Sequence, residues 1–320
     1  MYRFNSFQTF LLGLLCVVLA GLLTPAQAQD STAWPGGKTF VVGFAQDHMA
    51  NDWRAAQVRD VKRELDKYPF IKFIMTDSGG NTAQQISDIE NMAAQGVDVL
   101  ITSPRDAAAM TPLLSRIHRQ GTPVVLLSRM VEGDNFTTFI GASNIDIATK
   151  AAQYLGQRLN GKGRILILQH IPSSTPGRDR TNGFMAEIKK FPGIEIAAIK
   201  RADSMRNLAI KRIEEALAEN IQFDAIYAQS DSMASGARMA LMQAGIDPGS
   251  IPTVGIDYIT EAHDAIVAGQ QDASFTYPTF GKAGAEVAVK ILMGEAVPKT
   301  IMVESMAVTR DNVADVEPIF

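Results

Sequence analysis

Residues 40–57 read FVVGFAQDHMANDWRAAQ, and this stretch predicts the structural unit from which the fold is built. Its first six residues, 40–45, form a continuous apolar run without the alternation of a half-exposed strand. Such a run is typical of a strand buried on both faces, as strands are in parallel sheets covered by helices. Polar residues follow directly at 46–48, and a helix is expected after them. The stretch therefore indicates a parallel βα unit.

The same succession recurs along the chain and predicts an α/β protein. Ten strand candidates alternate with amphipathic helical segments, at residues 40–45, 70–76, 97–102, 123–127, 136–141, 164–169, 194–199, 225–228, 253–256 and 273–277. Ten strands are many for one parallel sheet, so we predict two doubly wound, Rossmann-like sheets of about five strands each. The division falls between residues 136–141 and a helix at 145–159. A single large α/β domain is the alternative.

The first 28 residues have the pattern of a secretory signal peptide. Arg3 is followed by an apolar run over residues 10–23 and by Ala26-Gln27-Ala28, an A-x-A cleavage pattern. The run is shorter than the roughly 20 residues that span a bilayer. We therefore predict cleavage after Ala28 and export to the periplasm, with an uncleaved anchor as the alternative. Cys16, the one cysteine of the chain, lies in this run, so the rest can form neither disulfides nor thiolate metal sites.

Composition and missing motifs narrow the function further. The 320 residues include 30 Lys and Arg against 34 Asp and Glu, which gives a net charge of -4 and no electrostatic reason to expect nucleic acid. The four histidines lack the spacing of a metal site. Phosphate-loop, nucleophile-elbow and zinc-protease motifs are missing from the sequence. We therefore predict neither catalysis nor a metal or cofactor.

The residues that end the predicted strands are polar. In open α/β sheets, ligands bind outside the carboxyl ends of the strands. The groups found there are Gln46-Asp47-His48, Asp77, Ser103, Ser128-Arg129, Asn144, Gln169-His170, Gln229-Ser230-Asp231, Asp257 and Thr276-Tyr277. Two such sets facing each other across a cleft would surround a small polyhydroxylated molecule. Carboxylates accept hydrogen bonds from hydroxyls, arginine donates through a planar fork, and an aromatic ring such as that of Trp53 can stack on a sugar ring.

Seven segments in order resemble the type I periplasmic sugar-binding proteins, the ribose- and galactofuranose-binding family. They are VGFAQ at 42–46, NDWRAA at 51–56, QGVDVLI at 95–101, GTPVV at 121–125, DRTNGF at 179–184, YAQSDSMA at 227–234 and VGID at 254–257. The resemblance implies two Rossmann-like lobes joined by three crossing strands and closing on a ligand. It implies an N-terminal lobe of residues 38–142 plus 276–303, and a C-terminal lobe of 143–275 plus 304–320.

The family's ligand site can be carried over residue by residue. The first lobe would contribute Gln46, Trp53, Arg54, Ser103 and Arg129, and the second Arg178, Ser230 and Asp257, with Thr276 at the hinge. By this resemblance Trp53 stacks on the sugar ring, Arg54 and Arg129 donate to hydroxyls, and Asp257 accepts from two adjacent hydroxyls. This chain departs from the family at Ser128, where Asp is common, at Ser230, where Asn is common, and at Ser204 or Met205, where the ribose branch has Phe. A modified sugar, a polyol or a small signalling molecule therefore stays open.

Each of these residues also has a purely structural interpretation. Trp53 can be a core anchor, and Asp231 and Asp257 can cap the helices that follow them. Asp52 can cap the first helix and leave Arg54 on a solvated face, and Arg129 and Arg178 can be ordinary surface arginines. His48 and His170 follow strands, and they either line the cleft or belong to loops.

The resemblance implies a monomeric solute-binding protein that delivers its ligand to an inner-membrane ABC permease by hinge closure. A second hypothesis is a sensor that presents the ligand to a membrane receptor or histidine kinase. A third, the effector domain of a lactose-repressor-type regulator, is disfavoured because an export signal occupies the position of the DNA-binding helices.

Overall fold

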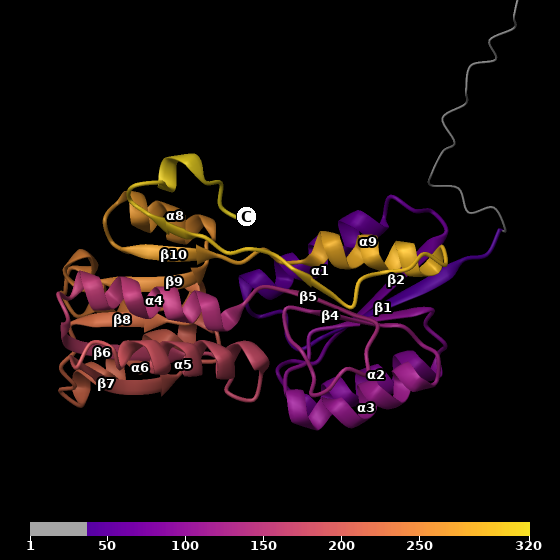
Figure 1. The fold of residues 1–320 in the computed structure, drawn as a ribbon, viewed down its shortest axis with the longest axis horizontal. Helices are drawn as coiled ribbons and strands as arrows, with labels where there is room; N and C mark the ends of the chain where they lie inside the picture. The colour runs from indigo at the N-terminus through magenta and orange to yellow at the C-terminus, as the bar shows by residue number, and fades with distance from the viewer. Residues whose placement is uncertain (1–36) are drawn as a thin grey trace, which may run out of the picture. The chain divides into compact units, whose positions relative to one another are not determined.

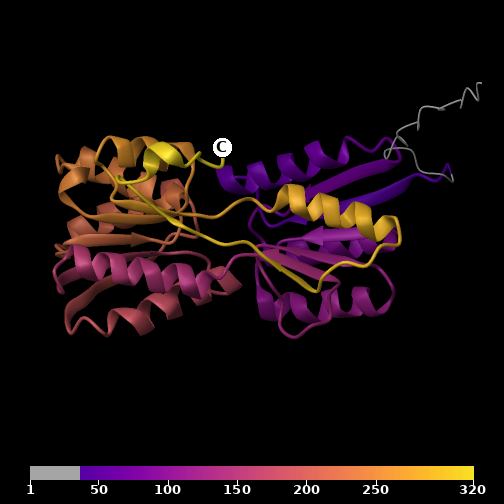
Figure 2. The same ribbon diagram turned by 45° about the horizontal axis from the view of Figure 1, so that its top comes forward.

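The computed structural model describes residues 37–320, so the predicted signal peptide lies outside the described residues. The first sheet has the strand order β11-β5-β4-β3-β1-β2, and each of its pairings is parallel. Its strands are β1 (Phe40–Gln46), β2 (Ile71–Asp77), β3 (Val99–Thr102), β4 (Val124–Leu127), β5 (Thr138–Gly141) and β11 (Thr300–Met302). Helices α1 (Asp52–Leu65) and α9 (Gly281–Leu292) lie side by side on one face, and α2 (Thr82–Ala94) and α3 (Ala107–Arg119) on the other (Figure 1, Figure 2).

The second sheet repeats this plan with the order β12-β10-β9-β8-β6-β7. Its strands are β6 (Lys162–Gln169), β7 (Gly193–Arg201), β8 (Ala225–Ala228), β9 (Thr253–Asp257), β10 (Ala273–Thr276) and β12 (Ala307–Thr309). Its helices are α4 (Asn144–Arg158), α5 (Thr175–Ile188), α6 (Arg206–Ala218), α7 (Asp231–Gln243) and α8 (Thr260–Val267). Two short 3-10 helices lie at Pro248–Ser250 and Val313–Asp315.

The chain passes between the two sheets three times, as the predicted hinge requires. The crossings lie between β5 and α4, between β10 and α9, and between β11 and β12. The second and third are tied together, because Thr276 N donates to Met306 O at 3.0 Å and Met306 N donates to Thr276 Oγ1 at 3.0 Å. Thr276 therefore lies at the hinge, while the predicted residue bounds of the two lobes stay a prediction.

The prediction of about five strands in each parallel sheet needs a correction. Each sheet has six strands, because β11 and β12 add one edge strand apiece. Both strands span only three residues, which is too short for a recognisable hydrophobic pattern in the sequence. Strand β12 runs antiparallel to β10. The second sheet is therefore mixed, although the fold remains two doubly wound lobes.

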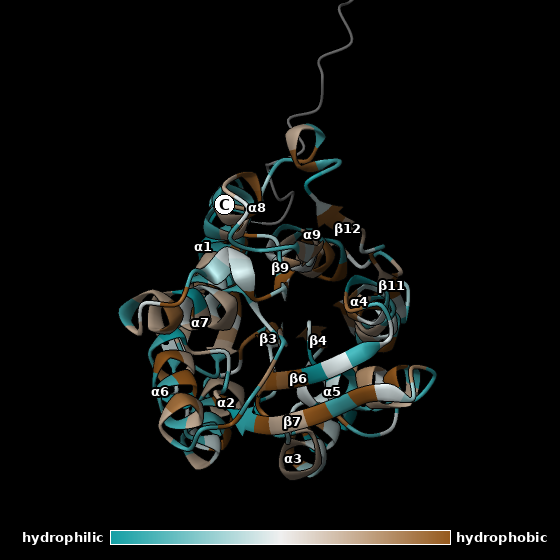
Figure 3. Cartoon of the chain, turned by 90° about the vertical axis from the view of Figure 1, so that its left-hand side faces the viewer, coloured by the Kyte–Doolittle hydropathy of each residue, from teal (hydrophilic) through white to brown (hydrophobic). Residues whose placement is uncertain are grey.

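Burial of the central strands explains their continuous apolar sequences. Val99 and Ile101 of β3 belong to the hydrophobic cluster on one face of the first sheet, and Leu100 belongs to the cluster on the other. The edge strand β7 instead includes hydrophilic residues among its hydrophobic ones, with Glu195 between two isoleucines and Lys200 and Arg201 at its end (Figure 3). None of the helices in residues 37–320 is long and apolar enough to cross a membrane.

Candidate functional site

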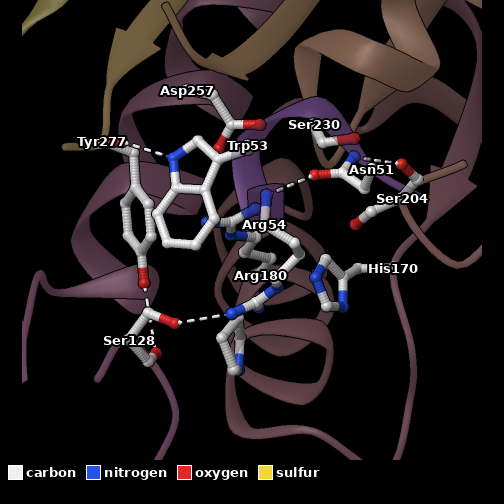
Figure 4. A pocket seen from close by; sticks show the side chains of 11 residues that line it. Asn51, Trp53, Arg54, Ser128, His170, Arg180, Ser204, Ser230, Asp257 and Tyr277 are labelled. Carbon is white, nitrogen blue, oxygen red and sulfur yellow. Dashed lines mark hydrogen bonds between the residues drawn. The ribbon is translucent and has the colours of Figure 1, made fainter. Parts of the chain in front are cut away.

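A small cavity lies where loops and helix starts from both sheets meet (Figure 4). Residues of the first lobe, of the second lobe and of one crossing segment contribute to its wall. They are Asn51, Trp53, Arg54, Ser128, His170, Pro176, Arg180, Ser204, Ser230, Asp257 and Tyr277. Of the nine residues that the resemblance assigned to a ligand site, Trp53, Arg54, Ser230 and Asp257 line this cavity.

Helix α1 begins at the cavity wall, and its cap differs from the expected one. Asn51, not Asp52, is the N-cap, because its side chain accepts a hydrogen bond from Arg54 N at 3.1 Å. The Asn51 amide also donates across the gap to Ser204 O at 2.7 Å and to Ser232 Oγ at 3.1 Å. Asp52 pairs instead with Arg206 of the second lobe at 2.8 Å. The residues at the start of α1 therefore form part of the cavity wall and also contact the second lobe.

Trp53 is a core residue that also reaches the cavity wall, and its stacking on a sugar stays a prediction. It is 4% exposed, belongs to the hydrophobic core of the first lobe, and packs against the rings of Tyr277 and Phe280. Its Nε1 donates to the backbone oxygen of Tyr277 at 2.9 Å. One part of the side chain also lines the cavity. Removing Trp53 would therefore damage the fold as well as the wall.

Behind the wall of the first lobe, Asp47 holds a cluster of arginines. Its carboxylate is fully buried and accepts from Arg129 Nη1 at 2.7 Å, while Arg54 Nε lies 3.6 Å from Oδ1 and Arg105 Nη1 3.4 Å from Oδ2. Burial alone would raise the pKa of Asp47, but the positive charges of Arg129 and then Arg54 outweigh it and hold this pKa well below its usual range. Burial lowers the pKa of Arg54 to about 9, so this guanidinium remains protonated at neutral pH.

Three predicted site residues lie behind the cavity rather than on its surface. Arg129 is fully buried beside Asp47. Ser103 Oγ accepts from Arg54 Nη1 at 2.7 Å, and Gln46 Nε2 donates to Gln57 Oε1 at 3.0 Å. Gln57 in turn accepts from Arg54 Nη1 at 3.2 Å. Gln46, Ser103 and Arg129 therefore surround and orient Arg54 from the side away from the cavity.

The arginine of α5 that faces the cavity is Arg180, and not the predicted Arg178. The Arg178 side chain is 51% exposed and pairs with Asp179 at 3.0 Å. Arg180 is 2% exposed, donates from Nε to Asn144 Oδ1 at 2.9 Å and from Nη1 to the backbone oxygen of Gln229, and lies over the Tyr277 ring at 4.6 Å. Residues two apart on a helix point about 200° apart, so only one of them can face inward.

Asp257 ends β9 with its carboxylate toward the cavity. It is 5% exposed, and its φ of 122° is a backbone conformation that side-chain-bearing residues rarely adopt. Among residues 37–320 the backbone of Asp231 donates to this carboxylate, and no side chain does. Burial raises the pKa of Asp257 well above its usual range, against the attraction of Arg180. A buried carboxylate without a side-chain donor is costly to the fold, and such strain is characteristic of functional sites.

The expected helix caps at Asp231 and Asp257 are wrong. Ser230 caps α7 by accepting from Met233 N, and α8 has no side-chain cap. Asp231 instead accepts from Ser274 Oγ at 2.5 Å, from Tyr258 N at 2.6 Å and from Gln271 Nε2 at 2.9 Å. It thereby ties α7 to β9 and β10.

The two histidines that follow strands have separate positions. His170 lines the cavity, and its Nδ1 accepts from Ile171 N at 2.7 Å, so the neutral ring carries its proton on Nε2. Burial lowers the pKa of His170 well below its usual value, and Arg129 lowers it further. His48 lines a neighbouring cavity, and burial lowers its pKa to about 4 against the attraction of Asp47. Both rings are therefore neutral at pH 7.

Direct contacts between the lobes surround the cavity. Besides the bonds of Asn51 and Asp52, Ala107 N donates to Ser173 O at 3.0 Å and Met130 N donates to Thr175 Oγ1 at 3.0 Å. The described residues contain no group of three His, Cys, Asp or Glu side chains able to hold a metal ion. The cavity wall combines polar side chains with the rings of Trp53 and Tyr277.

Comparison with known proteins identifies the class. Residues 42–296 match the family model described as a periplasmic binding protein domain, and the chain belongs to this family. A putative rhizopine-binding protein of Rhizobium meliloti is 31% identical over 249 residues, 75% of this chain and 80% of that protein. The ribose import binding protein of Bacillus subtilis is 26% identical over 91% of this chain and 93% of that protein.

Solved structures agree with the sequence relatives. The fructose-binding periplasmic domain of a hybrid two-component system superposes with a TM-score of 0.80 at 32% identity, covering 86% of this chain and 92% of that chain. A galactofuranose-binding protein superposes with a TM-score of 0.81 at 27% identity, covering 86% and 96%. The chain is therefore a type I periplasmic sugar-binding protein, as its sequence resemblance implied, and its relatives are binding proteins rather than enzymes.

Proposed function

We propose that this protein captures a sugar or sugar-like solute in the cavity between its lobes and delivers it to an inner-membrane ABC permease. It is exported by a signal peptide cleaved after residue 28 and works as a monomer. The ligand is held by Asp257, Arg180, Arg54 and Ser230 around the ring face of Trp53.

One observation carries the binding role. Asp257 and Arg180 are both buried in the same wall, and neither forms an ion pair within residues 37–320. Hydroxyl groups donate to a carboxylate and accept from a guanidinium, so a polyhydroxylated ligand satisfies both. The ring faces of Trp53 and Tyr277 supply apolar surface for its C–H groups.

The cavity is small, which favours a single sugar ring or cyclic polyol over an oligosaccharide.

Closure is the proposed mechanism of delivery. The contacts of Asn51 with Ser204 and of Asp52 with Arg206 join opposite lobes, so they exist only when the lobes are together. A ligand that touches both lobes binds the closed form better than the open form and shifts the population toward it. The permease then recognises the closed form.

Ligand screening tests this function. Purified mature protein is expected to show a raised melting temperature with one or a few members of a panel of pentoses, hexoses, furanoses and cyclic polyols. Small-angle scattering should show a smaller radius of gyration with the same compounds. A panel that changes neither quantity would contradict the proposal.

Two neighbouring arginines supply a matched pair of variants. Arg180→Ala removes charge-assisted hydrogen bonds from the cavity wall, so we expect affinity for the identified ligand to fall about 10- to 100-fold. Arg178→Ala removes the same side chain from an exposed position on the same helix and is expected to bind like the wild type. Calorimetry measures both. Equal losses in the two variants would remove Arg180 from the proposed site.

A sensor role is the second candidate, because the fructose-binding structural relative belongs to a two-component system. Deletion of the gene separates the two roles. Loss of uptake of the labelled ligand supports import, whereas loss of a ligand-induced transcriptional response with uptake intact supports sensing.

A further inference from the structure

The buried charges around the cavity do not balance. Three arginines, Arg54, Arg129 and Arg180, are each at most 5% exposed, and they face two buried carboxylates, Asp47 and Asp257. Asp231 and Arg238 are both buried and cancel each other's charge. Asp203 is paired with Arg201 at 2.6 Å, so Arg105, which lies 3.4 Å from Asp47, adds to the positive side. His48 and His170 are neutral, so positive charge is in excess.

The excess charge lies where a ligand can reach it. Asp47 is engaged by Arg129 at 2.7 Å and lies 3.6 Å from Arg54. Arg180 has no carboxylate within ion-pair distance in the described chain. The Nη2 atoms of Arg54 and Arg180 also have no hydrogen-bond partner within residues 37–320. Both arginines line the cavity, so each offers a free N–H edge to its contents.

The two guanidinium groups are held in position by neutral contacts. Arg54 lies over the Trp53 ring at 4.8 Å, and Arg180 over the Tyr277 ring at 4.6 Å. His170 adds a further donor, because its Nε2 carries the proton. Figure 4 shows Asp257 on one side of the pocket and Arg180 with Ser128 on the other. The wall is thus rich in donors, with one acidic acceptor at the far side.

We propose that the ligand is an acidic sugar, a monosaccharide-sized polyol that carries one carboxylate. Its hydroxyls bind Asp257, and its carboxylate binds the free edges of Arg54 and Arg180. An uncompensated buried charge is costly, and a negatively charged ligand reduces the excess. A carboxylate is planar and can accept parallel hydrogen bonds from the free edges of guanidinium groups. This inference rests on the proposed function.

Matched ligand pairs test the charge directly. The wild-type mature protein is titrated by calorimetry with neutral sugars and the corresponding acids, such as galactose with galacturonate and glucose with glucuronate, and with sugar phosphates. We expect the acid of at least one pair to bind about tenfold or more tightly than its neutral partner. A neutral sugar or a phosphate that binds as well as or better than every acid overturns the acidic ligand and leaves the binding function standing. Failure of all compounds overturns both.

A charge switch at Ser128 gives a second test within the protein. Ser128 Oγ lies 3.2 Å from Arg54 Nη1, and its φ of 60° is a conformation that Asp and Asn tolerate well. Ser128→Asp supplies the missing negative charge from the wall, and Ser128→Asn matches its size without the charge. We expect the ratio of acid to neutral affinity to be about tenfold or more lower in Ser128→Asp than in Ser128→Asn. Melting curves establish that both variants fold. Equal ratios in the two folded variants overturn the proposal.

Discussion

Replacing Asp257 by Asn is expected to weaken ligand binding about 100-fold or more. No side chain of residues 37–320 donates to the carboxylate, so most of its hydrogen-bonding capacity is left for the ligand, and two charge-assisted hydrogen bonds are worth about 3–6 kcal/mol together. Asn keeps the shape and tolerates the positive φ of this position. Calorimetry with the identified ligand measures the loss.

The same substitution is expected to stabilise the protein without ligand. Because burial raises the folded-state pKa of Asp257, its contribution to the free energy of unfolding becomes less favourable as the pH rises. The loss begins near the unfolded value of about 3.9 and is complete above the folded pKa. Asp257→Asn removes this cost, so its advantage over the wild type should be near zero at pH 4 and grow toward pH 8. Urea unfolding at both pH values measures it.

Asp264→Asn is the control for this prediction, since the side chain lies in the next helix and is 71% exposed. It changes the net charge equally but should alter neither affinity nor the pH dependence of unfolding. An Asp257→Asn protein that binds normally, or that is less stable than the wild type at pH 8, would show that Asp257 has a structural partner instead.

The fold was largely predictable because its central strands are buried on both faces. Strands such as β3 and β4 are continuous apolar runs, a pattern typical of strands in parallel sheets covered by helices on both faces. The edge strands β11 and β12 have three residues each and are half exposed, so their formation depends on pairing with β5 and β10. Pairing between distant segments leaves no local signal.

The cavity wall was predictable only in part. The rule that ligands bind at the carboxyl ends of strands points to Asp257 and Ser128, because position along a strand is a local property. The choice between Arg178 and Arg180 depends on the rotation of α5. A signal existed, since Arg180 is spaced three and four residues from Gly183 and Phe184 on the buried face. The ring of Tyr277 comes from a crossing segment, whose path depends on both lobes.

Replacing Asp47 by Asn is expected to lower the free energy of unfolding by about 3–5 kcal/mol, because Arg129 would be left buried without its carboxylate. The fold offers no other acidic partner within ion-pair distance of Arg129 in residues 37–320. Urea unfolding at pH 7 measures the loss. Asp66→Asn is the control, since Asp66 is an exposed partner of Lys62, and such pairs contribute little.

The pH dependence of this effect has the opposite sign to that of Asp257. The folded-state pKa of Asp47 is held well below its usual range, so its stabilising contribution is fully present above the unfolded value of about 3.9 and is lost as the pH falls through the folded pKa. Asp47→Asn should therefore cost most at neutral pH and progressively less in strong acid. A loss that does not change with pH would indicate a packing defect and not a lost charge.

The Asp47 variant also bears on the charge of the ligand. Without Asp47 the positive excess around the cavity grows by one charge, and a ligand carboxylate compensates one charge. An acidic sugar should then restore more of the lost free energy of unfolding than its neutral counterpart does. Each sugar is added at the same multiple of its own dissociation constant for the wild type. Equal recovery by both sugars would mean that the ligand's charge does not interact with Arg54 and Arg129. Solvent would then have to balance the excess positive charge.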